Sequence, residues 1–268
     1  MTIIDEIVEK KKKQLSAEKK KIPAKQLAET ISSLPKLPSF SKSLRKSRNV
    51  SFIFEHKTAS PSKGKLSGFA VGDVVSAYRK AGASAISVLA EKNYFLGSVE
   101  NVKRASAATR LPVLFKDFVF DDYQLLQARA AGASAVLLMN GVCPDIQLFL
   151  EKARELQLEC LVECTTAEQV LESLESGAKI IGINNRDFST LKTDLDKTAE
   201  LAPLIPSSVA LVSESGISSP QDVVTISKAG VDAILVGSHL MKSASLEELE
   251  KKARELVEAG KSRKVSRK

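Results

Sequence analysis

A short phrase recurs four times along this chain and strongly constrains its fold. Each copy follows a helical pattern, contains a glycine suited to the left-handed position just past a helix, and continues into an apolar run. Such a run predicts a strand buried on both faces, as the strands of parallel sheets are. The four copies, KAGASAISVL, AAGASAVLLM, ESGAKIIGIN and KAGVDAILVG, carry Gly82, Gly132, Gly177 and Gly230.

Four further apolar runs alternate with these copies, one before the first copy and one in each gap between copies: VSFIF (50–54), LPVLF (111–115), ECLVE (159–163) and VALVSE (209–214). Eight strands alternating with helices predict an α/β fold, the closed (β/α)8 TIM barrel, which typically takes about 250 residues. The alternative is an open, doubly wound sheet. A dinucleotide-binding sheet of that kind would be expected to carry a GxGxxG loop after its first strand, and the sequence has none there.

We expect three parts in the chain. Residues 1–47 form an N-terminal helical extension packed on the barrel, because Ile3, Ile7 and Leu15 lie on one helical stripe. Residues 48–259 form the barrel and hold the catalytic site. Residues 260–268 form a basic tail that we predict to be disordered.

The net charge of +8 belongs to the two ends of the chain. Residues 1–47 carry +7 and residues 251–268 carry +6, whereas residues 48–250 carry −5. Lysine runs are more often solvated helix faces than nucleic-acid sites, and no aromatic residues interleave with them here. We therefore expect no nucleic-acid partner.

Other classes of protein are also disfavoured. No apolar stretch reaches the ~18 residues of a membrane helix, and the N-terminus lacks the apolar block of a signal peptide. The three cysteines form no CxxC pair, which predicts reduced thiols in a cytoplasmic protein. His56 and His239 are far apart, so we expect no metal site.

Ionisable residues end the first, third, fifth and seventh predicted strands. Alternate strands of a barrel contribute side chains to the same interior layer, and chemistry occurs at their carboxyl ends. One such charge is more often an ordinary rim salt bridge, but several converging on one mouth favour an acid–base site. We expect partial desolvation to lower the pKa of Lys116 and make it a better proton donor. The converging residues are Glu55, Lys57, Lys116, Glu163 and Glu214.

Glycines follow the seventh and eighth strands, at Gly216 and Gly237. A bare backbone there can approach a ligand and offer N–H groups to a phosphate, and these loops are the usual phosphate site of the barrel. Ser60 in the first loop could add a hydroxyl donor.

Seven segments together resemble the indole-3-glycerol phosphate synthase family of tryptophan biosynthesis. They are FEHKTASPSKG, LPVLFKDFVFDDYQ, ARAAGASAVLLM, LVECTTAEQ, IIGINNRDF, VSESGI and LVGSHLM. The resemblance implies a carboxy-lyase that converts 1-(2-carboxyphenylamino)-1-deoxyribulose 5-phosphate to indole-3-glycerol phosphate by ring closure, decarboxylation and dehydration. It implies no cofactor and no metal.

The resemblance also implies roles for particular residues. Lys116 is expected to be the acid at the ribulose carbonyl, with Lys57 holding the substrate carboxylate or acting as a second acid; which lysine serves which step stays open. The catalytic positions are Glu55, Lys57, Lys116, Glu163, Asn184, Glu214 and Ser215. The phosphate site is Ser60, Gly216, Gly237 and Ser238, with Arg186 nearby, and the anthranilate pocket is Phe95, Phe118 and Leu137.

Two other hypotheses compete with this one. The first is a binding protein whose basic ends contact nucleic acid or acidic lipid. The second is another enzyme on the same barrel, such as phosphoribosylanthranilate isomerase, although the Cys-and-Asp pair expected for it is missing. On the hypothesis that the resemblance supports, the partner is a phosphorylated small molecule, and we expect neither a nucleic acid nor a membrane as a partner. A monomer and an association with other tryptophan-pathway enzymes both stay open.

Overall fold

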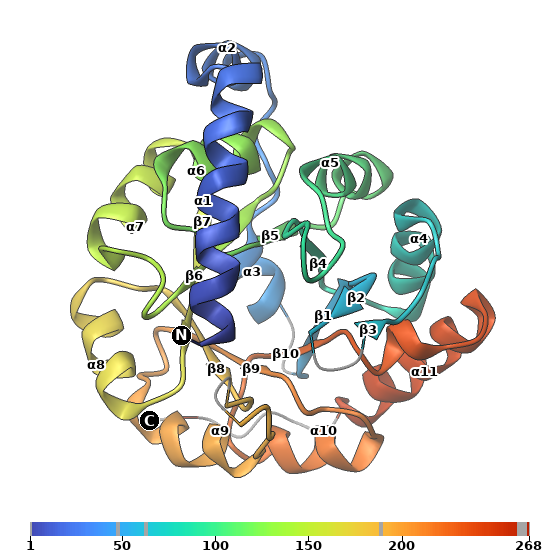
Figure 1. Ribbon diagram of the computed structural model, residues 1–268. Coiled ribbons are helices and arrows are strands. Elements are labelled where there is room, and N and C mark those ends of the chain that lie inside the picture. Colours follow the sequence, from blue (N-terminus) through green and yellow to red (C-terminus); the bar gives the residue numbers. More distant parts are fainter. Residues whose placement is uncertain (1, 47–48, 62–63, 188–189, 262–266, 268) are drawn as a thin grey trace.

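A computed structural model describes residues 2–46, 49–61, 64–187, 190–261 and 267 of the chain, and it contains a closed barrel of eight parallel strands (Figure 1). The first strand pairs with both the second and the last, which closes the ring and excludes the open sheet. The barrel strands are β1 (Ser51–His56), β4 (Ala85–Leu89), β5 (Val113–Lys116), β6 (Ala135–Met139), β7 (Glu159–Cys164), β8 (Ile180–Asn184), β9 (Ala210–Glu214) and β10 (Ala233–Val236).

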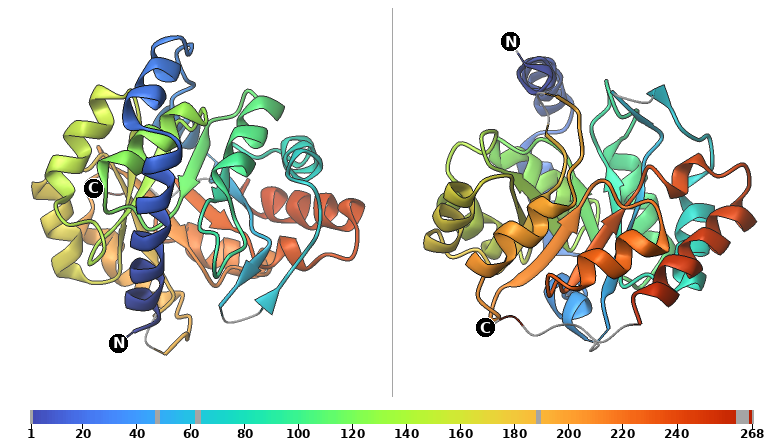
Figure 2. Two further views of the ribbon diagram at one scale, coloured as in Figure 1. Left: turned by 45° about the horizontal axis from the view of Figure 1, so that its top comes forward. Right: turned by 90° about the horizontal axis from the view of Figure 1, so that it is seen from below.

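Helices surround the strands and form the outer layer of the molecule (Figures 1 and 2). They are α4 (Val71–Ala81), α5 (Val99–Ala108), α6 (Asp122–Ala130), α7 (Ile146–Glu155), α8 (Ala167–Glu175), α9 (Asp196–Leu201), α10 (Pro220–Ser227) and α11 (Leu246–Ala259), with 3-10 turns η1 (Ala202–Leu204) and η2 (Leu240–Lys242). The predicted (β/α)8 barrel is confirmed.

The recurring glycines adopt the backbone conformation that the sequence predicts. Gly82, Gly132, Gly177 and Gly230 have φ values of 100°, 81°, 89° and 74°. A side chain is strained at such angles, so glycine allows each helix to stop and the next buried strand to begin within a few residues.

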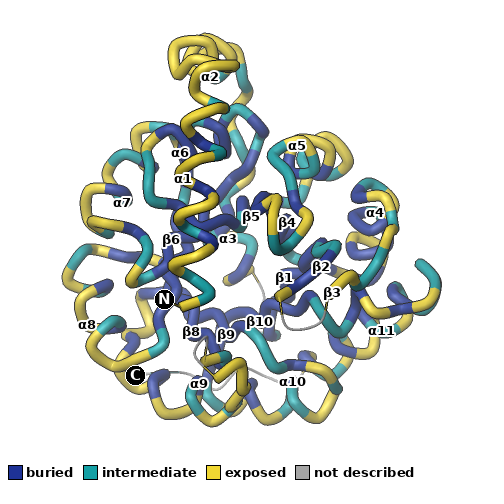
Figure 3. Tube along the Cα trace, in the orientation of Figure 1, coloured by how far each residue is buried: buried dark blue, intermediate teal, exposed yellow. Residues whose placement is uncertain are grey.

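The segment before the barrel contains three helices, α1 (Ile3–Lys21), α2 (Ala24–Ser32) and α3 (Phe40–Arg45). Thr2 and Asp5 form a capping box that starts α1. The first turns of α1 pack on the carboxyl end of the barrel, because Ile7 lies in one apolar cluster with Phe118 and Met139. By contrast, α2 buries none of its residues, as Figure 3 shows.

The third helix closes the opposite end of the barrel. Phe40 and Leu44 are fully buried and join the interior cluster of the barrel. Glu159, at the start of β7, accepts hydrogen bonds from the N–H groups of Phe40 and Ser41 and so stabilises the helix N-terminus. With this end filled, the cavity described below lies at the carboxyl end.

A two-stranded hairpin follows β1 and consists of β2 (Ala59–Ser60) and β3 (Gly64–Lys65). At the other terminus, residues 262–266 and 268 lie outside the described residues, and with them most of the tail predicted to be disordered. Arg267 is described and pairs with Asp232 at 2.9 Å. Within the described ranges, no helix has the length and apolar character needed to cross a bilayer.

Candidate active site

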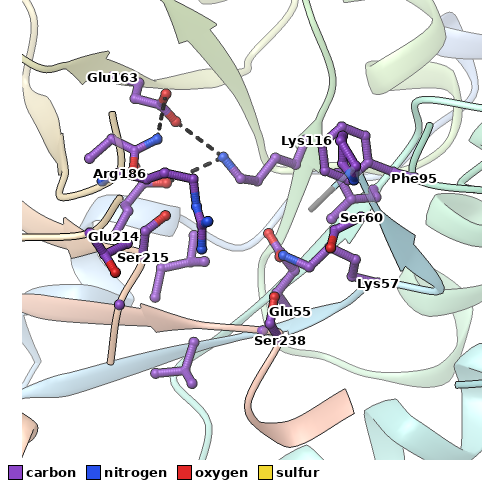
Figure 4. A pocket seen from close by; sticks show the side chains of 18 of the residues that line it. Glu55, Lys57, Ser60, Phe95, Lys116, Glu163, Arg186, Glu214, Ser215 and Ser238 are labelled. Atoms are coloured by element: carbon purple, nitrogen blue, oxygen red, sulfur yellow. Dashed lines mark hydrogen bonds and ion pairs between the residues drawn. The ribbon is translucent and has the colours of Figure 1, made fainter. Parts of the chain in front are cut away.

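A cavity of about 420 Å³ opens at the carboxyl end of the barrel strands. Every residue that the sequence assigns to catalysis or substrate binding lines it. They come from different strands and loops: Glu55, Lys57, Ser60, Phe95, Lys116, Phe118, Leu137, Glu163, Asn184, Arg186, Glu214, Ser215, Gly216, Gly237 and Ser238. Figure 4 labels several of these side chains.

Two lysines and three glutamates form the polar floor of this cavity. Lys116 Nζ lies 3.2 Å from Glu163 Oε2 and 3.3 Å from Glu214 Oε2. Lys57 Nζ lies 2.6 Å from Glu55 Oε1. The glutamate side chains are 2% exposed, whereas those of Lys57 and Lys116 are 14% and 16% exposed. The ammonium groups are thus the charges a ligand would meet first.

Neighbouring groups fix the carboxylates in place. Asn184 Nδ2 donates to Glu163 Oε1 at 2.9 Å, so Glu163 is held between an amide and an ammonium group. Ser87 Oγ donates to Glu55 Oε2 at 3.3 Å from the adjacent strand. Gly237 makes room for Glu55, because a Cβ there would lie 2.4 Å from Glu55 Oε1. Glycine at this position therefore leaves space for the Glu55 side chain, in addition to the close approach of a phosphate that the sequence suggested.

The expectation that Lys116 has a lowered pKa is wrong. Burial is the largest single influence and does lower the pKa, but the charges of Glu214, Glu163 and Glu55 together outweigh it and raise the pKa above its ordinary value. Lys116 is therefore fully protonated at neutral pH, as a general acid must be before it acts.

The surrounding carboxylates differ in their protonation. Burial raises the pKa of Glu214 to about 7, with Glu163 and Glu55 adding to the rise and Lys116 opposing it. For Glu55, burial acts upward, but Lys57 and Lys116 outweigh it and the pKa falls below its usual range. Groups with pKa values pushed apart in one cavity are typical of acid–base sites.

The raised pKa of Glu214 gives a prediction for stability. The folded protein holds this proton more tightly than the unfolded chain, so the free energy of unfolding should fall as pH rises from about 4.5 to about 7. Glu214→Gln removes this effect. Between pH 5 and pH 8, wild type should lose stability relative to Glu214→Gln by on the order of 3 kcal/mol. Urea unfolding of both proteins measures the difference; an equal difference at the two pH values would contradict it.

One side of the cavity offers hydrogen-bond donors. Ser60 Oγ is buried and has no hydrogen-bond partner among the described residues. The loops after β9 and β10 add Gly216, Gly237 and Ser238, and Arg186 lines the same cavity. Backbone N–H groups with a hydroxyl and a guanidinium suit a phosphate.

The other side is apolar. The rings of Phe95 and Phe118 lie 6.2 Å apart, tilted by 41°, and Leu137 is buried nearby. Ile3 and Ile7 of α1 also line the cavity. The sequence predicted only that these two residues pack on the barrel. Their apolar stripe on α1 was the available signal, because that face had to cover something apolar.

Two sets of buried polar contacts hold this apolar wall, and the charged residues that form them are not among those the sequence assigns to the site. Lys11 Nζ on α1 lies 2.5 Å from Asp117 Oδ2, and both side chains are at most 1% exposed. The Glu91 carboxylate accepts hydrogen bonds from the N–H groups of Asn93, Tyr94 and Phe95 at 2.7 to 3.0 Å. The first contact ties α1 to the loop that carries Phe118, and the second orders the loop that carries Phe95.

The fold and this cavity define a (β/α)8-barrel enzyme with an acid–base floor, an aromatic wall and an anion cradle. Within the described residues, no three His, Cys, Asp or Glu side chains are arranged to hold a metal ion. The indole-3-glycerol phosphate synthase family model matches residues 4–256. The chain belongs to the indole-3-glycerol phosphate synthase family.

Curated relatives agree with this assignment, and solved structures share the barrel fold. An indole-3-glycerol phosphate synthase of Methanothermobacter marburgensis is 42% identical over 268 residues, which is all of this chain and 96% of that relative. One of Dehalococcoides mccartyi is 41% identical over 91% of this chain and 96% of its own length. Thiamine phosphate pyrophosphorylase from Pyrococcus furiosus has a TM-score of 0.62 at 20% identity, covering 82% of this chain and 97% of its own, and shares the fold alone.

Proposed function

We propose that this chain converts 1-(2-carboxyphenylamino)-1-deoxyribulose 5-phosphate to indole-3-glycerol phosphate, with loss of carbon dioxide and water. The observation that carries the proposal is the position of Lys116, held by Glu163 and Glu214 in the cavity that Phe95 and Gly216 also line. A substrate with an aromatic ring at one end and a phosphate at the other matches the chemistry of that cavity. Family membership supports the same reaction.

Ring closure is the first step. The aromatic carbon bearing the carboxylate attacks the ribulose carbonyl carbon, and Lys116 donates a proton to the carbonyl oxygen, which becomes a hydroxyl. Lys57 holds the substrate carboxylate. Attack leaves a non-aromatic ring with positive charge spread onto its nitrogen, and Glu55 and Glu163 stabilise that charge from buried, preorganised positions. Loss of carbon dioxide then restores the aromatic ring.

Dehydration completes the reaction. Glu163 takes a proton from the carbon beside the nitrogen, and Lys57 protonates the departing hydroxyl, so that the new double bond completes the indole. Asn184 orients Glu163 and the sugar hydroxyls. Glu214 and Ser215 hold the groups beside them, which for Glu214 is the ammonium group of Lys116. The phosphate remains bound by Ser60, Gly216, Gly237, Ser238 and Arg186 throughout.

We also propose that the protein works in the cytoplasm. Cys143, Cys160 and Cys164 are free and buried, and burial raises the pKa of each thiol, which suits structural thiols in a reducing compartment.

Incubation of the purified protein with the carboxyphenylamino substrate tests the function, with indole fluorescence as the readout. We expect fluorescence to rise with time and carbon dioxide to be released in equal amount. Phosphoribosylanthranilate serves as the control substrate and should give no isomerised product. A flat trace from folded protein, confirmed by circular dichroism, would reject the proposed function.

A further inference from the structure

A buried ring of three polar side chains lies behind the phosphate side of the cavity. Asn185 Nδ2 lies 3.0 Å from Ser213 Oγ, Thr198 Oγ1 lies 2.7 Å from Asn185 Oδ1, and the two hydroxyls lie 2.8 Å apart. Asn185 is 1% exposed, and Thr198 and Ser213 are fully buried. None of the three lines the cavity.

Hydrogen-bond stoichiometry fixes the direction of every bond in this ring. Thr198 uses its single proton on Asn185 Oδ1, so Ser213 must donate to Thr198. Ser213 then accepts from Asn185 Nδ2, which closes the cycle. One N–H of Asn185 remains, and it donates to the carbonyl oxygen of Ser215 at 3.1 Å. Reversing the amide would place Asn185 Oδ1 against this carbonyl oxygen, so only one orientation is favourable.

Ser215 has an unusual backbone that needs such support. Its φ is 69°, in the left-handed region that side chains disfavour, and Gly216 follows with a φ of 86°. A non-glycine residue stays there only when its surroundings hold it. The ring of Asn185, Thr198 and Ser213 supplies the hydrogen bond that does so.

The peptide between Ser215 and Gly216 connects this ring to the cavity. In a trans peptide the C=O and N–H groups point in opposite directions. Because Asn185 holds the Ser215 carbonyl from behind, the Gly216 N–H points away from Asn185, toward the side where Ser215 and Gly216 line the cavity. Among the described residues, this N–H donates to no protein acceptor.

We propose that Asn185, oriented by Thr198 and Ser213, is a positioning residue for phosphate binding: it never touches the ligand but aims the Gly216 N–H at the phosphate. The inference rests on the proposed function only for the identity of the substrate, because it concerns binding of the phosphate group itself.

The test uses full-length Asn185→Ala and Thr198→Val, with Thr198→Ser as the conservative rescue. The matched control is Ser173→Ala, which removes a buried hydroxyl that Asn140 contacts at 3.2 Å, in another polar cluster of the barrel. Three quantities are measured: the inhibition constant of inorganic phosphate, the KM and kcat of the phosphorylated substrate, and the KM of the same substrate without its phosphate. Calorimetric titration with inorganic phosphate needs no turnover.

We expect Asn185→Ala and Thr198→Val to raise the phosphate inhibition constant and the KM of the phosphorylated substrate about tenfold, the scale of one hydrogen bond. The kcat should stay near wild type, because the lost interaction binds substrate and transition state alike. Thr198→Ser and Ser173→Ala should behave like wild type, and none of the variants should alter the KM of the dephosphorylated substrate.

Unchanged phosphate affinity in folded Asn185→Ala would overturn the inference, as would an equal rise in KM for the substrates with and without phosphate. Wild-type protein that binds phosphate in a manner sensitive to Asn185 but forms no indole would support the inference and reject the proposed function.

Discussion

Replacing Lys116 by alanine should lower kcat at least ~10²-fold, the scale expected for a positioned general acid. Lys116 is the cation shared by Glu163 and Glu214, and in the proposed mechanism it is the proton donor for ring closure. The loss also removes the charge that opposes the rise in the pKa of Glu214, so this buried carboxyl group holds its proton more tightly. Both consequences should lower kcat and change KM less. Steady-state assays of indole fluorescence measure both constants.

A matched control for this variant is Lys179→Ala. Lys179 is exposed and directly precedes β8, at the amino end of the barrel and away from the cavity. Its replacement should leave kcat unchanged. Turnover of folded Lys116→Ala near the wild-type rate would show that another group is the acid.

Replacing Glu163 by glutamine should lower kcat by ~10²-fold or more. The substitution keeps the size of the side chain and removes its charge, so it tests the stabilisation of the cationic intermediate and the removal of a proton during dehydration. Asn184 Nδ2 would still find an oxygen to donate to, although Lys116 would lose one of its two carboxylate partners. Single-turnover experiments would show which step slows.

The same strand offers the control. Glu159 starts β7 and binds the N-terminus of α3 at the far end of the barrel. Glu159→Gln should reduce thermal stability through the loss of a charged helix cap, typically by about 1 kcal/mol, and leave kcat unchanged. A similar loss of kcat in both variants would mean that Glu163 acts through the fold and not in the reaction.

The barrel could be predicted from the sequence because the features that indicate it are local. Each glycine at a helix end and each β-branched run after it reports on a few neighbouring residues. The alternation of side chains along strands then indicated that Glu55, Lys116 and Glu163 face one mouth. The structure brings these residues into one cavity.

Features that depend on several distant segments were not predictable in the same way. The sign of the Lys116 pKa shift depends on three carboxylates at particular distances. The sequence indicated only the effect of burial, which lowers this pKa. The lining by Ile3 and Ile7 depends on where α1 docks. The ring joins Asn185, which directly follows β8, to Ser213 of β9 and Thr198 of α9. None of these three residues is ionisable, so the pattern of charged strand ends does not indicate the ring.

The central claim is that one cavity holds the aromatic end and the phosphate end of a single substrate with Lys116 at its carbonyl. A crystal structure with the reduced substrate, in which the carbonyl is a hydroxyl, tests this most directly. We expect the phosphate on Ser60, Gly216 and Ser238, the ring between Phe95 and Leu137, and the hydroxyl within about 3 Å of Lys116 Nζ. A ligand bound in the opposite orientation, or with its hydroxyl out of reach of Lys116, would contradict the account.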